Sequence, residues 1–267
     1  MNIVLWINKE SNQKALANKI HESHSIVGIV LETRKIKRKI SLKISFSKAI
    51  EKVFLADIGK SWNGMKKHYE NQYPLFPSAR TLEVENINTE EAYNFTKELN
   101  PDLIIVSGTR LIKDRMLSIK PSIGILNLHT GLSPYIKGGP NCTNWCLATK
   151  QFHLIGNTIM WIDAGIDTGN IITTEFTRFD GSEKLADIHL KVMEHAHDLY
   201  LKAIALIRDG KTINVKQSNI AKGKTYYTKQ WGLKQQINLI SNLSLFRKRI
   251  RSGEVERMQV EVTTVGI

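Results

Sequence analysis

The chain has 267 residues, a length that fits one large domain or one domain with an appendage. Hydrophobic residues make up 42% and charged residues 24%, which excludes a disordered chain, a collagen-like fibre and a low-complexity scaffold. Cys142 and Cys146 are too few for a disulfide framework or a four-cysteine zinc site. The first residues turn polar too soon for a signal peptide, and no apolar run approaches the ~18 residues of a membrane span, so we expect a cytoplasmic protein.

Net charge is the unusual bulk property of the chain, at +13 with a sequence pI near 9.6. Residues 211–267 hold 11 basic and 3 acidic side chains, and residues 34–48 hold seven Lys or Arg and no acid. Such charge favours anionic partners, which include phosphates, nucleic acid and an acidic membrane surface. A lysine-rich solvated surface accounts for the same charges, so charge alone leaves the partner open.

The first half of the chain alternates predicted strands with predicted helices, a rhythm typical of a parallel sheet with crossover helices. One helix begins with Asn88 as its N-cap and Glu91 at the third helical position, and it runs to about Leu99. The basic segment 34–48 interrupts the rhythm and fits either a half-buried strand or an amphipathic surface helix. Strands are predicted at residues 3–7, 25–31, 82–84, 103–106 and 123–128.

The second half begins with a predicted helix over residues 139–149, with Pro140 near its first turn. A long amphipathic helix is predicted over 183–209 and is stopped by Gly210. Between these helices, two strands are predicted at 155–162 and 170–174, joined by the loop 163–169.

These elements predict an α/β fold, with a Rossmann-like, mostly parallel twisted sheet and flanking helices. The composition turns polar and basic after residue 210, so we place a domain boundary there. Residues 1–210 then form the main domain, and residues 211–267 form a small appendage with two strands and a short helix.

Asn127 and His129 form the first candidate site, two residues apart at the end of an apolar strand, so they project from one face. The carboxyl edge of a parallel sheet is where open α/β folds bind ligands. A histidine can hold or give a proton near neutral pH, and an asparagine amide can donate to an oxygen that becomes negative. The pair indicates an acid–base site with an oxyanion donor, although a histidine satisfied within a loop fits the residues as well.

Asp163 and Asp167 form the second candidate, two carboxylates four residues apart in a loop with two glycines. They could bind a cation or hold a protonated histidine, and a plain turn is the simpler alternative. The pair His195 and His197 in the long helix, like the two cysteines, is expected to be core or surface rather than metal-binding, so no metal is predicted.

Together the two candidates resemble the formyltransferase family. The resemblance lies in Asn127-Leu128-His129, then Leu132-Ser133-Pro134 with a Gly-rich turn, then Ile166-Asp167-Thr168-Gly169. Members of that family transfer a formyl group from 10-formyltetrahydrofolate to an amine, and include methionyl-tRNA, glycinamide ribonucleotide and amino-sugar formyltransferases. The resemblance covers residues 80–210 well and the opening strands loosely.

This resemblance implies a catalytic trio of Asn127, His129 and Asp167. The Asn127 amide and a protonated His129 would hold the oxyanion that forms when the amine attacks. Asp167 would keep His129 charged and help to move a proton from the amine, with no metal or covalent intermediate.

The resemblance also implies binding residues. The pterin of the formyl donor would lie against the backbone of two loops, and the acceptor would lie near the Gly-rich turn. The implied donor-binding residues are Ser107, Gly108, Arg110, Leu111, Ile112, Ile162, Asp163, Ala164 and Gly165. The implied acceptor-binding residues are Thr130, Ser133, Lys137, Gly138 and Asn141.

The acceptor favoured by the sequence is a nucleotide-linked amino sugar of surface polysaccharide (lipopolysaccharide O-antigen) biosynthesis. The loop 130–134 departs from the Ser-Leu-Leu-Pro run typical of the tRNA enzymes, and the tail 211–267 is short for their extra barrel domain. The segment 134–141 looks more like the amino-sugar enzymes. Methionyl-tRNA, glycinamide ribonucleotide and hydroxyornithine remain alternative acceptors.

Three further questions stay open at the level of sequence. A basic nucleic-acid or membrane-surface binder on the same scaffold is the non-enzyme alternative, with residues 246–251 as its contact. The aromatic residues Tyr226, Tyr227 and Trp231 could stack on a base or pack the appendage. A homodimer is one option for the assembly.

Overall fold

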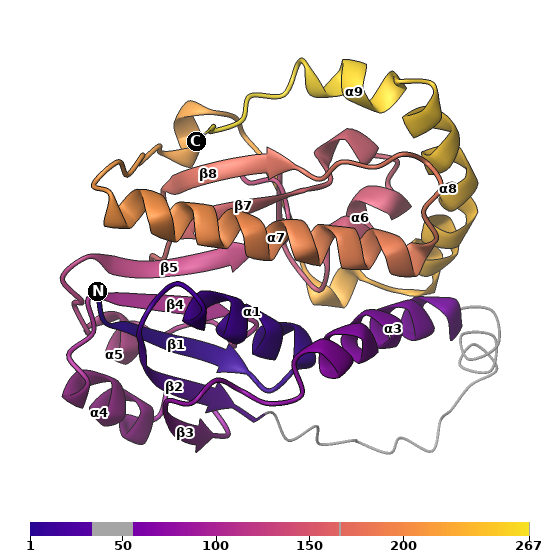
Figure 1. Cartoon of the computed structure of the whole chain (residues 1–267). Coiled ribbons are helices and arrows are strands. Elements are labelled where there is room, and N and C mark those ends of the chain that lie inside the picture. The colour runs from indigo at the N-terminus through magenta and orange to yellow at the C-terminus, as the bar shows by residue number, and fades with distance from the viewer. Residues whose placement is uncertain (34–55, 166, 267) are drawn as a thin grey trace.

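The structure is a computed structural model, and it describes residues 1–33, 56–165 and 167–266. A seven-stranded sheet has the order β3-β2-β1-β4-β5-β7-β8 (Figure 1). The first five strands are parallel, and β7 and β8 add two antiparallel pairs at one edge. The strands are β1 (Ile3–Asn8), β2 (Ile26–Glu32), β3 (Arg80–Val84), β4 (Leu103–Ser107), β5 (Gly124–His129), β7 (Gly156–Trp161) and β8 (Ile171–Phe176). The predicted Rossmann-like, mostly parallel sheet is confirmed.

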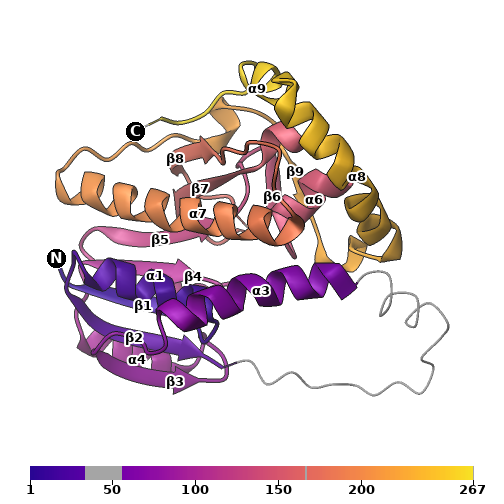
Figure 2. The ribbon, with the colours of Figure 1, turned by 45° about the vertical axis from the view of Figure 1, so that its right-hand side comes forward.

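Helices cover both faces of this sheet (Figures 1 and 2). Side chains of β1 alternate between them: Ile3, Leu5 and Ile7 pack with α1 and α7, whereas Val4 and Trp6 pack with α4 and α5. This two-sided burial explains why the parallel strands read as continuous apolar runs. The helices of the two faces are α1 (Ser11–His21), α3 (Ala56–Gln72), α4 (Glu90–Glu98), α5 (Asp114–Leu117) and α7 (Leu185–Arg208).

Two helix starts differ from the prediction. The N-cap of α4 is Thr89, whose side chain accepts a hydrogen bond from the Ala92 N–H, while the Asn88 side chain binds the backbone of the loop near Leu111. Helix α6 spans Cys142–Ala148 rather than beginning at residue 139. Asn141 has an extended backbone and caps α6 by accepting from the Asn144 N–H, so the helix begins only after it.

The tail after residue 210 was predicted to hold two strands and a short helix; over residues 211–266 it holds one named strand and a short helix, and a long helix that was not predicted. Helix α8 spans Leu233–Arg251 and packs on α6, followed by α9 (Glu254–Gln259). In the part of the tail that is described, β9 (Lys224–Tyr226) is the one named strand, and it pairs in parallel with β6 (Ile136–Gly138). Short 3-10 turns lie at Phe152–Leu154, Gln217–Asn219 and Thr228–Gln230.

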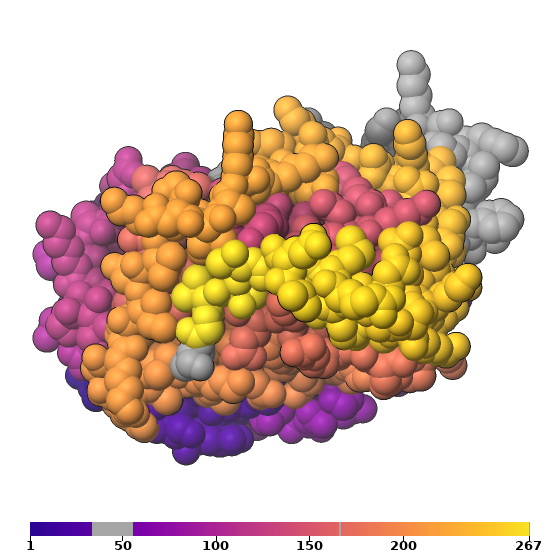
Figure 3. Space-filling model, turned by 90° about the horizontal axis from the view of Figure 1, so that it is seen from above, coloured from indigo at the N-terminus to yellow at the C-terminus, as the bar shows by residue number. Residues whose placement is uncertain are grey.

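The tail shares its buried core with the main part of the chain. The ring of Phe246 in α8 lies edge-on to that of Phe152, with 5.4 Å between the ring centres. The ring of Trp145 in α6 stacks on that of Tyr226 in β9, with 4.3 Å between the ring centres. Seen from above, the last residues lie over segments from the middle of the chain (Figure 3). The domain boundary near residue 210 stays a prediction, but the two parts pack against each other rather than standing apart.

Two remaining expectations concern the basic segment 34–48 and the prediction that no part of the chain spans a membrane. The basic segment 34–48 lies outside the described residues, so its predicted strand or helix stays a prediction. Among the helices in the described ranges, none combines the length and the apolar character needed to cross a bilayer.

Candidate active site

A cavity of about 340 Å³ lies beside β5, within the size range of small-molecule sites. Three parts of the chain line it: the loop that follows β4, the loop between β7 and β8, and a wall built by β6 and the tail. Asn127 and His129 project from the same face of β5, as their spacing predicts, and Asn127 lines the cavity. Its lining includes Val106, Gly108, Leu111, Asn127, Gly138, Met160, Trp161, Asp163, Asp167, Tyr226 and Tyr227.

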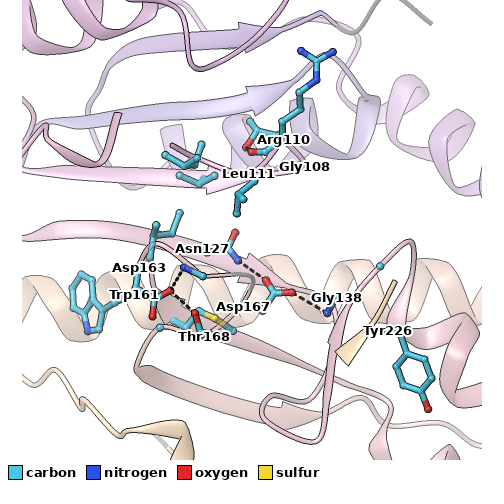
Figure 4. A pocket seen from close by; sticks show the side chains of 18 of the residues that line it. Gly108, Arg110, Leu111, Asn127, Gly138, Trp161, Asp163, Asp167, Thr168 and Tyr226 are labelled. Atoms are coloured by element: carbon cyan, nitrogen blue, oxygen red, sulfur yellow. Dashed lines mark hydrogen bonds between the residues drawn. The ribbon is translucent and has the colours of Figure 1, made fainter. Parts of the chain in front are cut away.

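Asp167 is the centre of the site, because three groups converge on its carboxylate, and Figure 4 shows two of them, Asn127 and Gly138. Asn127 Nδ2 lies 3.3 Å from Oδ1, and the Gly138 N–H donates to Oδ2 at 3.1 Å. His129 Nδ1 lies 3.3 Å from Oδ2. The structure therefore brings the three predicted catalytic residues together, although 40 residues separate Asn127 from Asp167.

His129 is buried and charged. Burial alone would lower its pKa, but the Asp167 carboxylate, with smaller contributions from Cys142 and the Ile136 carbonyl, raises the pKa to about 10. Its Nε2 lies 3.1 Å from the Ile136 carbonyl oxygen and 3.6 Å from Cys142 Sγ. With an acceptor at each ring nitrogen, the imidazole is fixed as the protonated partner of Asp167.

This orientation separates the roles within the trio. Asn127 and Asp167 line the cavity, whereas His129 lies behind Asp167 and is not among the lining residues. The predicted direct contact between His129 and an oxyanion therefore has no support from this placement. His129 contacts the Asp167 carboxylate, and Asp167 is the one of the two that lines the cavity.

The two carboxylates of the aspartate loop have different partners. Asp163 Oδ1 accepts from the Gly165 N–H at 2.9 Å and from the Thr168 hydroxyl at 2.6 Å, which closes the loop on itself (Figure 4). Asp167 turns to His129 instead. Of the two alternatives, Asp167 therefore fits the one in which a carboxylate holds a protonated histidine. Asp163 fits the other, because it stabilises the turn of its own loop.

The loop after β4 is fixed by polar side chains that sequence reasoning missed. Asn8 Nδ2 donates to the Gly108 carbonyl at 2.8 Å, and Asn88 Nδ2 donates to the Leu111 carbonyl at 3.1 Å. The buried Glu32 carboxylate accepts from the Arg110 N–H at 3.0 Å. The signal was a polar residue at the end of each of two apolar strands, Asn8 on β1 and Glu32 on β2.

Most of the predicted donor-binding residues line the cavity. These are Gly108, Arg110, Leu111, Ile112, Ile162, Asp163 and Gly165. Ser107 is buried at the end of β4 and Ala164 is exposed, and neither is part of the lining. The Arg110 guanidinium donates to the Glu85 carbonyl oxygen at 2.7 Å, and it forms an ion pair with Glu32 Oε1 at 3.6 Å.

Of the predicted acceptor-binding residues, Gly138 alone is among the lining residues. A side chain at this position would collide with the Tyr226 carbonyl, so glycine permits the close pairing of β6 with β9. Asn141 caps α6, and Ser133 is buried where its N–H donates to Thr158 Oγ1. Thr130 and Lys137 are half-buried outside the lining.

The tail contributes residues that the sequence did not place at the site. Tyr226, Tyr227 and Thr228 line the cavity beside Gly138 and Gly139. Tyr226 is nearly buried by its stack on Trp145, whereas Tyr227 is 48% exposed. Trp231 packs edge-on against Trp145 at 5.0 Å. The expectation of core packing therefore holds for Tyr226 and Trp231, and Tyr227 is free of the stack.

Neither the cysteines nor the helix histidines form a separate site among the described residues. Cys142 and Cys146 are buried free thiols, and burial raises the pKa of both. His197 is fully buried, and His195 lies 3.2 Å from Glu175. In the described ranges, no three His, Cys, Asp or Glu residues gather as a metal site would require.

An amide, a carboxylate and an imidazole beside a small-molecule cavity are groups that acid–base chemistry on an α/β sheet can use. The sequence profile of the formyl transferase family matches residues 1–204. The chain belongs to this family, as the motif resemblance implied.

Solved structures of similar fold cover most of the chain. One is an N-formyltransferase from Helicobacter canadensis in complex with folinic acid and dTDP-3-aminofucose, with a TM-score of 0.57 and 18% identity over 93% of this chain and 82% of that one. Another is glycinamide ribonucleotide transformylase 1 from Symbiobacterium toebii, with a TM-score of 0.54 and 16% identity over 81% of this chain and 94% of that one. At these identities the likeness concerns the fold.

Curated relatives are similar over part of the chain. A methionyl-tRNA formyltransferase from Clostridium tetani is 32% identical over 120 residues, which are 45% of this chain and 38% of the relative. One from Flavobacterium psychrophilum is 30% identical over 166 residues, which are 61% of this chain and 52% of the relative. The chain thus spans about half or less of the length of these relatives.

Proposed function

We propose that this protein transfers the formyl group of 10-formyltetrahydrofolate to the amine of a nucleotide-linked amino-deoxysugar. The observation that carries the proposal is the convergence of Asn127, His129 and Gly138 on Asp167 at the wall of the cavity. A site of this kind suits an amine that must lose a proton while a carbonyl oxygen gains negative charge.

The donor side of the cavity fits a flat, hydrogen-bonding ring. Residues 108–112 line it together with Ile162, Asp163 and Gly165, beside Val106 and Met160. Leu111 is 52% exposed and forms part of the same wall. When bound there, 10-formyltetrahydrofolate supplies an activated formyl group, and these residues would hold its pterin.

The polar centre supplies the remaining chemistry. Asn127 has a second amide N–H beyond the one directed at Asp167, and it can donate this hydrogen to the oxygen that gains charge. Asp167 can accept a hydrogen bond from the attacking amine and relay its proton, through water, toward the departing nitrogen. The ion pair between His129 Nδ1 and Asp167 Oδ2 at 3.3 Å would hold the carboxylate in place for this step.

Residues on the acceptor side of the cavity support the proposal that the acceptor is a sugar nucleotide. Tyr227 offers an exposed ring to a base or sugar, and Lys229 Nζ lies 6.0 Å from the centre of that ring. Lys224 Nζ lies 4.8 Å from the Tyr226 ring. The exposed Tyr227 ring next to these cations suits a planar base and a diphosphate. The Helicobacter canadensis protein of similar fold was solved with dTDP-3-aminofucose.

Methionyl-tRNA is the second candidate acceptor. The curated relatives named above are methionyl-tRNA formyltransferases, and residues 211–267 hold 11 basic and 3 acidic side chains. This surface would attract a polyanion. In the segment 246–251, however, Phe246 and Ile250 are buried and Arg249 pairs with Glu254 at 3.2 Å, which leaves less of it for a nucleic-acid or membrane contact.

The test is turnover of 10-formyltetrahydrofolate with 3-amino and 4-amino deoxysugar nucleotides, glycinamide ribonucleotide, hydroxyornithine and charged initiator tRNA. We expect turnover with one sugar nucleotide and a fall in kcat of about 100-fold or more in Asn127→Ala, as for a lost oxyanion donor. Turnover with tRNA alone would replace the sugar by the second candidate. Salt-sensitive binding of nucleic acid without turnover of any amine would favour the non-enzyme alternative.

A further inference from the structure

Gln217 belongs to the tail, yet its side chain contacts the loop that carries Asp167. Its Nε2 lies 2.8 Å from the Asp167 carbonyl oxygen and 2.8 Å from the Gly169 carbonyl oxygen. An amide nitrogen has two N–H groups, so these two carbonyls use both. The opposite amide orientation would place an oxygen against two carbonyl oxygens, so the donor role of this side chain is fixed. Gln217 is 7% exposed, which shields both hydrogen bonds from water.

The backbone of Asp167 requires such support. Its φ is +51°, in the left-handed region that residues with a side chain seldom occupy. The neighbouring Gly169 packs so closely on the Trp161 carbonyl that it has no room for a side chain. A carbonyl turned into the protein at such a turn needs a donor, and Gln217 provides one for each of two carbonyls.

The main chain that carries Gln217 is itself fixed to the sheet. Val215 and Ile171 exchange both backbone hydrogen bonds, at 2.9 Å and 2.8 Å, where β8 begins. Gln217 then opens the 3-10 turn Gln217–Asn219. The side chain therefore extends from an anchored backbone, and its position is set by β8 rather than by the aspartate loop.

We propose that Gln217 is a positioning residue for the formyl-transfer site: it holds the Asp167 backbone so that the carboxylate meets Asn127, His129 and Gly138 together. Gln217 is not among the residues that line the cavity, so it acts through Asp167. The kinetic part of this proposal rests on the proposed function, and the geometric part does not.

Gln217→Met removes the amide and keeps a side chain of similar length. We expect kcat to fall about 10- to 100-fold with a smaller change in the KM of the formyl donor, because a misplaced catalytic group loses rate more than binding. If this variant does not fold, Gln217→Asn takes its place, since it keeps a buried amide but withdraws it by one methylene. An unchanged kcat in the folded variant contradicts the proposal.

Asn242 provides the matched control. It is also a buried tail amide, and its Nδ2 donates to the carbonyls of Leu147 and Ala148 at 2.9 Å and 3.3 Å, away from the cavity. Asn242→Leu should lower the thermal midpoint of unfolding while kcat stays within about threefold of the wild type, as its distance from the reacting groups implies. An equal loss of kcat in both variants would reduce Gln217 to a general structural role.

NMR titration of His129 tests the geometry without any substrate. The titratable groups in contact with His129 are Asp167 and Cys142. If Gln217 positions Asp167, the pKa of His129 falls in Gln217→Met from its high wild-type value toward that of an ordinary buried histidine, and it is unchanged in Asn242→Leu. An identical pKa in wild type and Gln217→Met overturns the proposal. Failure of every amine to react would refute the proposed function and leave this result standing.

Discussion

The two walls of the cavity are built in different ways. The wall proposed to hold the formyl donor includes residues 108–112, here called the donor wall. Asn8 and Glu32, at the ends of β1 and β2, hold it together with Asn88 from the loop between β3 and α4. The acceptor wall combines β6 with β9 and with Tyr227 of the tail. The family match covers residues 1–204, so it includes the whole donor wall and only part of the acceptor wall. Under the proposed function, the donor side thus lies wholly within the part of the chain that the family shares, and the tail adds residues to the acceptor side.

Asp167 belongs to neither wall alone, since it joins Asn127 of β5 to Gly138 of β6. Asp167→Asn should therefore give the largest loss, with kcat about 1,000-fold or more below wild type, because it removes both the proton relay and the partner of a buried cation. Steady-state turnover of the formyl donor, with circular dichroism to confirm folding, measures the effect. A folded Asp167→Asn enzyme within tenfold of wild type would exclude Asp167 from the centre of the site.

The same ion pair makes stability depend on pH. The pKa of His129 is about 10 in the folded protein, against an ordinary value of 6.5. Protonation therefore favours the folded state: this contribution is complete below about pH 6.5 and is lost as pH rises toward 10. Urea unfolding at intervals between pH 6.5 and 10 should show a falling free energy of unfolding in the wild type. The fall should be smaller in His129→Asn, and equal slopes would show that another group titrates.

The sequence was sufficient for the sheet and for the proximity of Asn127, His129 and Asp167, but not for the orientation of these three side chains. Apolar runs predicted the strands because both faces of a parallel strand are buried. The side chain of His129 points to the Ile136 carbonyl and Cys142, which depends on how β6 and α6 pack and leaves no mark on local sequence. Cys142 was predicted to be a core residue, and it is both buried and a neighbour of His129.

The tail was the least predictable region. A short helix was expected where the long helix α8 lies, although Leu239, Phe246 and Ile250 stand at helical spacing and are buried against the main part of the chain. Gln217 reaches Asp167 across 50 residues. Contacts of this range are decided by tertiary packing, and neither periodicity nor local motifs encode them.

The most direct test of the two-wall account compares Leu111→Ala with Tyr227→Ala. Both side chains are about half exposed and line the cavity, one on each wall, so both variants should fold. Leu111→Ala should raise the KM of the formyl donor about tenfold and leave that of the acceptor unchanged, as expected for lost apolar contact. Tyr227→Ala should do the reverse. If both variants raise the same KM, or neither raises any, the division into a donor wall and an acceptor wall is wrong.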